Sequence, residues 1–338
     1  MAGFQIKDPP TDGITKVIFG GNFAQFLLAS SWDCKVRLYE VNKNAIRFEY
    51  SHDLPVLDCC LLDNVYAFSG GLDCTLKMFD FNSQKELCLG KNHKSAIRCI
   101  LHSSKLNAIL TGSWDSTVRI WDCRDRKISS SMNQSSKVYT MDCVNDRLVV
   151  GTSDRKVSIW DLRSTQSPIS SKDSSLKFQT RCIKCFPNGQ GYILGSIEGR
   201  VAVEFFNSTA STNNDSSTAC STITTQKRYA FKCHRGKYKE GDVDLIWPVN
   251  CIEFHPIHGT FATGGSDGYV HVWDGINKKR LSQFHQYDTG VTSLAFSPDG
   301  IRLAIATSYN FEVGEQTPKP IDGIFIRLVS DSECRPKA

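Results

Sequence analysis

Short segments in which apolar and polar residues alternate run along the whole chain. Alternation with a period of two is typical of half-buried β-strands, whereas an amphipathic helix repeats its apolar positions every three to four residues. Residues 97–100 and 118–121 alternate in this way, and turns rich in Gly, Ser and Asp separate such segments. The pattern therefore predicts an all-β protein.

One motif returns at regular intervals along the chain. It begins with small residues and an acidic turn, and it continues into an alternating strand that ends, in its complete form, in Trp-Asp. The aromatic residue of the motif is Tyr39, Phe79, Trp121 and Trp160 in turn, at spacings of 40, 42 and 39 residues. A weaker copy covers residues 196–203, a strong one residues 266–274, and the last has lost its acidic turn.

Each repeat has room for four strands, because alternating segments also precede and follow the motif. Four strands in a repeat of about 40 residues are typical of one blade of a β-propeller. Seven copies predict seven blades in a single domain that spans residues 1–338. At this point the chain resembles the WD-repeat β-propeller family.

The last blade is one strand short in its own sequence, which supplies strands only at residues 291–296, 301–307 and 324–329. Residues 4–7 alternate and precede the first strand of blade one. We expect them to pair as the outer strand of blade seven, which would close the ring and remove an open sheet edge.

Two insertions interrupt the repeat. Residues 207–226 are almost all small and polar and cannot bury apolar area, so we expect a mobile loop between the third and fourth strands of blade five. Residues 309–322 lengthen a turn of the last blade.

Composition excludes several classes of protein. The 338 residues carry 40 Lys and Arg against 35 Asp and Glu, and a net charge of +5 is too small an excess to indicate nucleic-acid binding. No apolar run is long enough for a membrane helix, and we expect no secretion because no apolar leader segment is present. The 14 cysteines lie mostly in apolar runs, so we interpret them as reduced and buried.

Blade three contains a polar set that invites a catalytic interpretation. The candidates are His93, Thr111 or Ser113, Asp115 and Trp121, of which we assign Ser113 to the set. Such residues also occur in hydrolases, but the sequence has no nucleophile elbow, and buried imidazole and indole groups need partners in any case. We therefore predict a structural tetrad and no catalytic residues.

Cys182 and Cys185 have the spacing of a metal or redox pair. They lie in an alternating segment, where residues three apart point to opposite faces, so a shared metal would need a broken strand. Cys233 and His234 are also interpreted as structural. We predict no metal and no cofactor, and the absence of a catalytic constellation favours a binding scaffold over an enzyme.

The residue before the acidic turn indicates a binding face. Turn tips are usually polar, yet this position holds Trp32, Leu72 and Trp114 in blades one to three. A contiguous exposed apolar patch marks a site for a partner. The alternative is that each indole folds back and packs onto its own turn.

Cationic residues are predicted beside this patch. The opening residues of the innermost strands should ring the central channel, and among them Arg98, Tyr139 and Arg181 form an arc that suits peptide carboxylates. The other ring positions are Thr15, Leu57, Asn250 and Thr292.

Blade five adds a basic cluster that could hold a phosphate, or that could be an ordinary solvated strand edge. Its residues are Arg200, Lys227, Arg228, Lys232 and Arg235.

Blade five also carries a more specific resemblance, in residues 179–182, 195–204 and 229–235. These stretches are similar to the spindle-checkpoint propellers named for budding uninhibited by benzimidazole, and to their mRNA-export relatives at nuclear pores. The end of blade six and residues 322–327 favour the checkpoint members. The insertion at residues 207–226 departs from the family, and we expect it on the face opposite the binding face.

The resemblance implies a non-enzymatic adaptor of the spindle assembly checkpoint that acts in the nucleus and at mitotic kinetochores, with a possible cytoplasmic pool. Positions matching Trp32, Trp114 and Arg181 would hold an acidic segment of checkpoint kinases, the GLEBS motif. Positions matching Arg200 and Lys232 would contact a phosphothreonine repeat of the kinetochore scaffold. The alternative is an mRNA-export factor that binds a nucleoporin segment at the nuclear pore. An enzyme site and direct binding of nucleic acid are the weaker alternatives.

Overall fold

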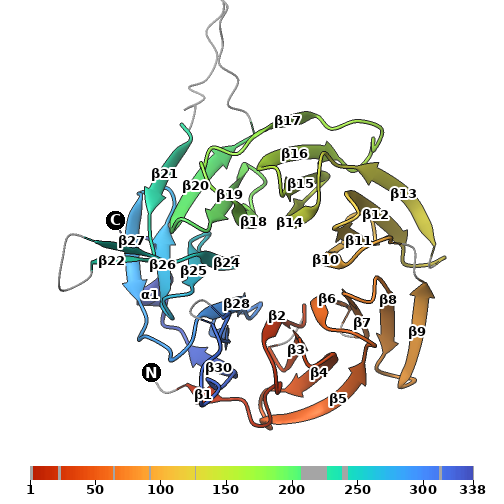
Figure 1. Ribbon diagram of the computed structural model, residues 1–338, viewed down its shortest axis with the longest axis horizontal. Coiled ribbons are helices and arrows are strands. Elements are labelled where there is room, and N and C mark those ends of the chain that lie inside the picture. The colour runs from red at the N-terminus through yellow and green to blue at the C-terminus, as the bar shows by residue number, and fades with distance from the viewer. Residues whose placement is uncertain are drawn as a thin grey trace, which may run out of the picture.

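The computed structural model describes residues 3–21, 24–63, 65–90, 93–125, 127–206, 227–237, 243–311 and 314–337. Within these ranges, seven four-stranded antiparallel sheets stand as blades around a central channel (Figure 1). The predicted seven-bladed propeller is thereby confirmed. Helix α1 (Asp331–Cys334) follows the last blade, and no helix in the described ranges is long and apolar enough to cross a membrane.

Each blade is given from its innermost to its outermost strand. Blades one to three consist of β2 (Ile14–Phe19), β3 (Phe26–Ser31), β4 (Lys35–Glu40) and β5 (Ala45–Ser51); β6 (Val56–Leu62), β7 (Tyr66–Gly71), β8 (Leu76–Asp80) and β9 (Lys85–Gly90); and β10 (Ile97–Ser103), β11 (Ala108–Ser113), β12 (Thr117–Asp122) and β13 (Ile128–Asn133). Blades four and five consist of β14 (Val138–Val144), β15 (Arg147–Thr152), β16 (Lys156–Asp161) and β17 (Ser170–Asp173); and β18 (Thr180–Cys185), β19 (Gly191–Ser196), β20 (Arg200–Phe205) and β21 (Tyr229–Lys232). Blades six and seven consist of β24 (Val249–Phe254), β25 (Phe261–Gly265), β26 (Val270–Asp274) and β27 (Lys279–Gln283); and β28 (Val291–Phe296), β29 (Arg302–Thr307), β30 (Gly323–Leu328) and β1 (Phe4–Gln5).

Burial decreases from the middle of a blade to its outer edge. The second strand has sheet neighbours on both sides and adjacent blades above and below, so β11 and β19 are buried at every position. The outer strand is a sheet edge, and β9 is exposed over its first four residues. This gradient explains why second strands are small and apolar and outer strands are mixed.

The N-terminal strand closes the ring as predicted. β1 pairs with β30, with Phe4 opposite Ile326 and Gln5 opposite Phe325. The next residue, Ile6, donates its backbone N–H to the carbonyl of Ile324 and is fully buried. Its side chain joins a core cluster formed by blades one and seven, so the two ends of the chain share one core.

A small hairpin between blades five and six was not predicted. Its strands β22 (Arg235–Lys237) and β23 (Asp244–Ile246) extend from the rim of the ring (Figure 1). The predicted loop at residues 207–226 lies outside the described residues. The strands that flank it in the sequence, β20 and β21, are neighbours in the sheet of blade five.

Candidate functional site

A bulge in the innermost strand recurs in all seven blades. In blade three, Ile97 pairs with Ser113 and Cys99 pairs with Gly112, so Arg98 has no partner across the strand. A bulge re-aims the side chain of the unpaired residue, here at the mouth of the channel. The residues left unpaired are the seven predicted ring positions, namely Thr15, Leu57, Arg98, Tyr139, Arg181, Asn250 and Thr292.

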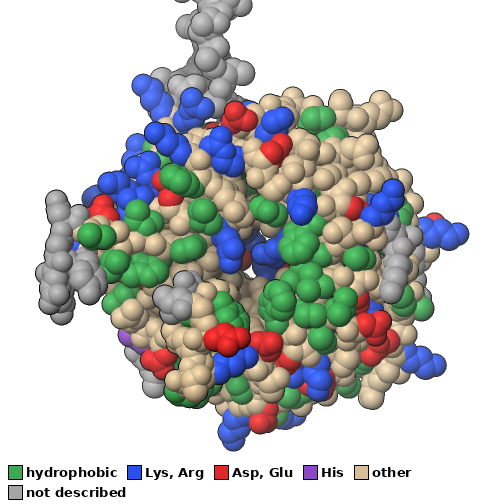
Figure 2. Space-filling model, viewed as in Figure 1, with side chains coloured by type: hydrophobic (Ala, Val, Ile, Leu, Met, Phe, Trp, Pro, Cys, Tyr) green, Lys and Arg blue, Asp and Glu red, His purple; other side chains and the backbone are tan. Residues whose placement is uncertain are grey.

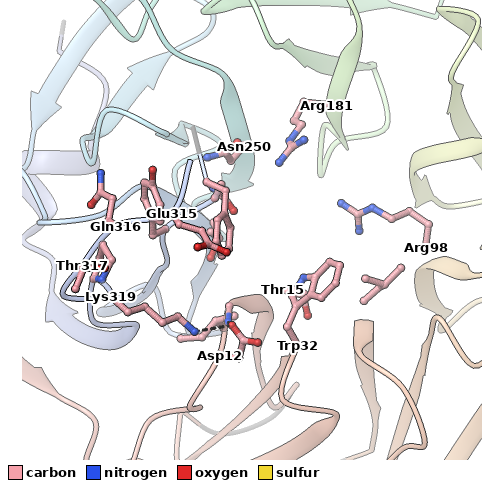
Figure 3. A pocket seen from close by; sticks show the side chains of 18 of the residues that line it. Asp12, Thr15, Trp32, Arg98, Arg181, Asn250, Glu315, Gln316, Thr317 and Lys319 are labelled. Carbon is pink, nitrogen blue, oxygen red and sulfur yellow. Dashed lines mark hydrogen bonds and ion pairs between the residues drawn. The ribbon is translucent and has the colours of Figure 1, made fainter. Parts of the chain in front are cut away.

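A cavity of about 800 Å³ opens at this mouth (Figure 3). Six of the seven ring residues line it, together with Trp32 and Trp114. Tyr139 lines a smaller hollow of about 100 Å³ in the channel, which shares Arg98 and Arg181 with the cavity. The predicted aromatic and cationic residues therefore meet in one site.

The two tryptophans are partly packed and partly open. Trp32 is 47% exposed, and its ring lies so close to Gly13 that a Cβ there would be 3.4 Å away. Trp114 is half-buried, and its Nε1 has no hydrogen-bond partner in the described part of the chain. Leu72 is half-buried and does not line the cavity. The two tryptophans therefore share the cavity, whereas Leu72 lies outside it, and the binding role of all three residues stays a prediction.

The charges of the channel differ between its mouth and its interior. Inside, Lys184 forms an ion pair of 3.0 Å with Glu253 and lies 4.0 Å from Asp142. Burial opposes the charged form of Lys184, but these carboxylates outweigh it and raise the pKa of Lys184. At the mouth, Arg98 makes no hydrogen bond or ion pair with the described residues. Its guanidinium is thus available to an incoming carboxylate.

Blade five places two basic residues side by side on the cavity face. Arg200 begins β20 and lies directly opposite Lys232, which ends β21. Both residues lie at the end of blade five that contains the turn before β20. The equivalent turns of blades one and three carry Trp32 and Trp114, so all four residues lie on the same face of the ring. Neither side chain has an ion pair among the described residues. Figure 2 shows Lys and Arg side chains gathered over this part of the rim.

Arg235 has a different environment from the other two residues of the predicted phosphate site. Its Nη2 donates a hydrogen bond of 2.7 Å to the carbonyl oxygen of Glu198, and Nε lies 3.5 Å from that of Gly199. The Glu198 carboxylate is also 4.0 Å from the guanidinium. Arg235 therefore holds the turn that precedes Arg200 with its Nε and Nη2, and its assignment to the phosphate site stays a prediction.

The polar set of blade three is a chain of buried hydrogen bonds. His93 Nδ1 lies 2.9 Å from the carboxylate of Asp115, and Nε2 lies 2.8 Å from the hydroxyl of Thr111. That hydroxyl oxygen accepts the N–H of Trp121 at 2.9 Å. Burial opposes ionisation of Asp115, but hydrogen bonds, first among them that from Thr117, lower its pKa to about 2. A structural tetrad is therefore present in blade three, with His93, Asp115 and Trp121 in it as predicted.

One member of the predicted tetrad is wrong. Ser113 donates its hydroxyl to the carbonyl of Ser95 instead, and Thr111 takes its place. Trp121 lies opposite Ile109 on the neighbouring strand, so its indole reaches two residues along to Thr111. Ser113 lies about 7 Å further along the strand, beyond that reach.

The same hydrogen-bonded set recurs in blade six. His234 bonds Asp267 at 2.8 Å and Thr263 at 2.9 Å, and Trp273 donates to Thr263 at 3.0 Å. The structural interpretation of His234 is therefore confirmed. Its spacing to Trp273 is 39 residues, against 28 from His93 to Trp121, because the hairpin of β22 and β23 lies between His234 and blade six.

Cys182 and Cys185 point away from each other, as expected for residues three apart in a strand. The Cys182 thiol lies 3.5 Å from the carbonyl of Val249, whereas the Cys185 thiol lies 3.6 Å from that of Asp142. The first contact is with blade six and the second with blade four. The two thiols therefore do not converge on a common ligand position.

Comparisons with known proteins agree with this architecture. The family described as "WD domain, G-beta repeat" matches residues 85–122, 246–274 and 278–313. The chain is 47% identical to mitotic checkpoint protein BUB3.1 of Arabidopsis thaliana, over 99% of this chain and 95% of the relative. It is 40% identical to mitotic checkpoint protein bub-3 of Caenorhabditis elegans, over 99% and 96%.

Two further comparisons are more distant. The chain is 33% identical to mRNA export factor GLE2 of Chaetomium thermophilum, over 98% of this chain and 92% of the relative. The solved structure of U3-55K superposes with a TM-score of 0.79 over 96% of this chain and 98% of that one, at 15% identity. This last likeness concerns the fold alone.

Proposed function

The chain belongs to the BUB3 family of WD40-repeat proteins, and on that premise we propose that it is an adaptor of the mitotic spindle assembly checkpoint. In this proposal the propeller catalyses no reaction. It binds acidic GLEBS-type segments of checkpoint kinases in the cavity, reads phosphothreonine repeats of the kinetochore scaffold on blade five, and so recruits checkpoint proteins to unattached kinetochores. Its place of action is the nucleus, and the kinetochore during mitosis.

The observation that carries the proposal is the composition of the cavity. Two partly exposed indoles, Trp32 and Trp114, line the same space as Arg98 and Arg181. Aromatic anchors supply most of the binding energy in protein interfaces, and guanidinium groups bind carboxylates with two parallel hydrogen bonds. An extended segment that carries both apolar and acidic side chains fits this combination.

The phosphate part of the proposal rests on the pair Arg200 and Lys232. Their Cα atoms are cross-strand partners, so both side chains leave the same face of the sheet. A phosphothreonine carries nearly two negative charges at pH 7 and can accept charge-assisted hydrogen bonds from both. Arg235 supports the site by holding the turn at Glu198.

Calorimetric titration of the full chain with an acidic kinase segment tests the cavity. Trp114→Ala is expected to weaken binding by roughly 2 kcal/mol or more, because truncation of a central aromatic anchor has an effect of this size. Wild-type affinity of the variant would remove Trp114 from the site. The Ser153→Ala variant, at the equivalent turn of blade four, is the matched control.

A pair of peptides with and without phosphate on one threonine tests blade five. Arg200→Ala is expected to abolish the preference for the phosphorylated peptide while leaving the acidic kinase segment bound. Equal discrimination by wild type and variant would refute the phosphate assignment.

The mRNA-export alternative uses the same face, and the likeness to GLE2 keeps it open as a second candidate. Pull-down of the chain with nucleoporin and checkpoint-kinase segments separates the two. Preferential capture of the nucleoporin segment would favour the export function over the checkpoint function.

A further inference from the structure

The insertion of blade seven builds one wall of the cavity. Residues 309–311 and 314–322 belong to the connection between β29 and β30, and Phe311, Glu315 and Lys319 are among the lining residues. Arg98 and Arg181 reach into the cavity from blades three and five, whereas Glu315 and Lys319 lie on the opposite side (Figure 3). The cavity therefore has two walls of different chemistry.

Among the described residues of the blade-seven wall that line the cavity, Glu315 supplies the one carboxylate. Lys319 is compensated, because its Nζ forms an ion pair of 2.9 Å with Asp12 of blade one. Glu315 is exposed and has no hydrogen bond or ion pair with any described residue. A negative charge thus faces the two arginines across the open space without contacting them.

An aromatic ring lies on the same wall. Phe311 is 58% exposed and lines the cavity, and its ring contacts that of Tyr309 at a centroid distance of 5.5 Å. A solvated carboxylate together with an exposed aromatic face is a combination that attracts a cation, through an ion pair and through the quadrupole of the ring. A guanidinium can make both interactions, because its flat face stacks on the ring while its N–H groups donate to the carboxylate.

We propose that the blade-seven wall, formed by Phe311 and Glu315, is a subsite for an Arg or Lys side chain of the segment that binds the cavity. The inference deepens the proposed function and rests on it. Carboxylates of the segment bind toward Arg98 and Arg181, and its basic residue binds toward Glu315. The cavity thereby selects segments whose acidic and basic residues follow one another in a fixed order. It disfavours uniformly acidic segments, because their carboxylates would be repelled by Glu315.

The test uses a set of acidic peptides in which a single Arg is moved from position to position, each paired with the same peptide carrying neutral citrulline. Dissociation constants are measured with the full chain at low ionic strength for wild type, for E315Q and for Q316A. In wild type, one position is expected to favour Arg over citrulline by about fivefold to tenfold, the size of an exposed ion pair with a cation–π contact. Raising the salt concentration reduces that preference.

The variants separate the possible outcomes. E315Q should remove the preference for Arg and tighten binding of the uniformly acidic peptide, whereas Q316A, a neutral change on the same wall, should keep the preference. Acidic peptides that bind without any Arg preference, or a preference unchanged in E315Q, would overturn the subsite and leave the proposed function standing. Failure of every acidic peptide to bind, with or without Arg, would overturn the proposed function itself.

Discussion

Trp32 offers the sharpest test of the cavity, because its exposed area fixes how much binding energy it can contribute. We expect Trp32→Ala to weaken binding of an acidic partner segment and to leave folding intact. The side chain is 47% exposed in the free protein, and its remaining surface rests on its own blade beside Gly13. A partner that covers the indole would bury only the exposed part.

The expected magnitude follows from that area. A Trp side chain presents up to about 250 Å², so roughly 120 Å² remain for a partner to cover. At about 25 cal/mol per Å² this burial contributes about 3 kcal/mol, which corresponds to a loss of affinity of roughly 100-fold.

The assay is calorimetric titration of the segment into wild type and variant, with the urea midpoint measured in parallel. The control is Ile276→Ala, because Ile276 is 76% exposed but lies in the turn between β26 and β27, on the opposite face of the ring. Its loss should leave binding unchanged. An affinity of Trp32→Ala within about twofold of wild type would refute the assignment of Trp32 as an anchor.

Three further predictions concern the scaffold. Thr111→Val should lower the free energy of unfolding in urea by about 2–5 kcal/mol, because it leaves the buried His93 imidazole and Trp121 indole without their shared partner. The control is Thr289→Val, which should have little effect because the buried hydroxyl of Thr289 has no partner among the described residues. Equal effects of the two variants would contradict the tetrad. Deletion of residues 1–8 should lower the melting temperature sharply because it opens blade seven, and an unchanged melting curve would argue against closure by β1. Burial, helped by the neighbouring His234, lowers the pKa of His271 to about 4, so the folded state binds fewer protons than the unfolded state between pH 6.5 and 4. The free energy of unfolding should therefore fall as the pH drops through this range, and His271→Phe should flatten the fall in urea midpoints measured across it; the same slope in the variant would exclude His271 as its source.

The fold could be predicted from the sequence because every blade repeats the same local pattern. The aromatic residue of the motif and the acidic turn recur at nearly constant spacing, and the side-chain period of two fixes which residues face inward. Even the closing strand was predictable, since blade seven lacked a partner and residues 4–7 alternate.

The ring of channel residues could be predicted by comparing equivalent positions of the repeats, but the alternation of residues within one strand does not reveal it. The opening position of each inner strand reaches the channel because of a bulge, which shifts the register between residues such as Ile97 and Cys99. Equivalence between repeats identified these positions correctly, although the bulge itself has no sequence signature in a single blade.

Features that depend on one loop or one side-chain length were not predictable. The choice between Thr111 and Ser113 depends on how far the indole of Trp121 reaches along the strand. The contact of Arg235 with Glu198 depends on the hairpin that follows blade five. The role of Glu315 depends on where an insertion without a repeat partner folds.

The adaptor account is tested most directly by the indole N–H resonances of the chain, which contains six tryptophans. Titration of the ¹⁵N-labelled protein with an acidic checkpoint-kinase segment should shift the signals of Trp32 and Trp114, which line the cavity. The signals of the tryptophans bonded inside the blades, Trp121, Trp160 and Trp273, should stay in place. A segment that binds while the Trp32 and Trp114 signals remain unmoved would contradict the account.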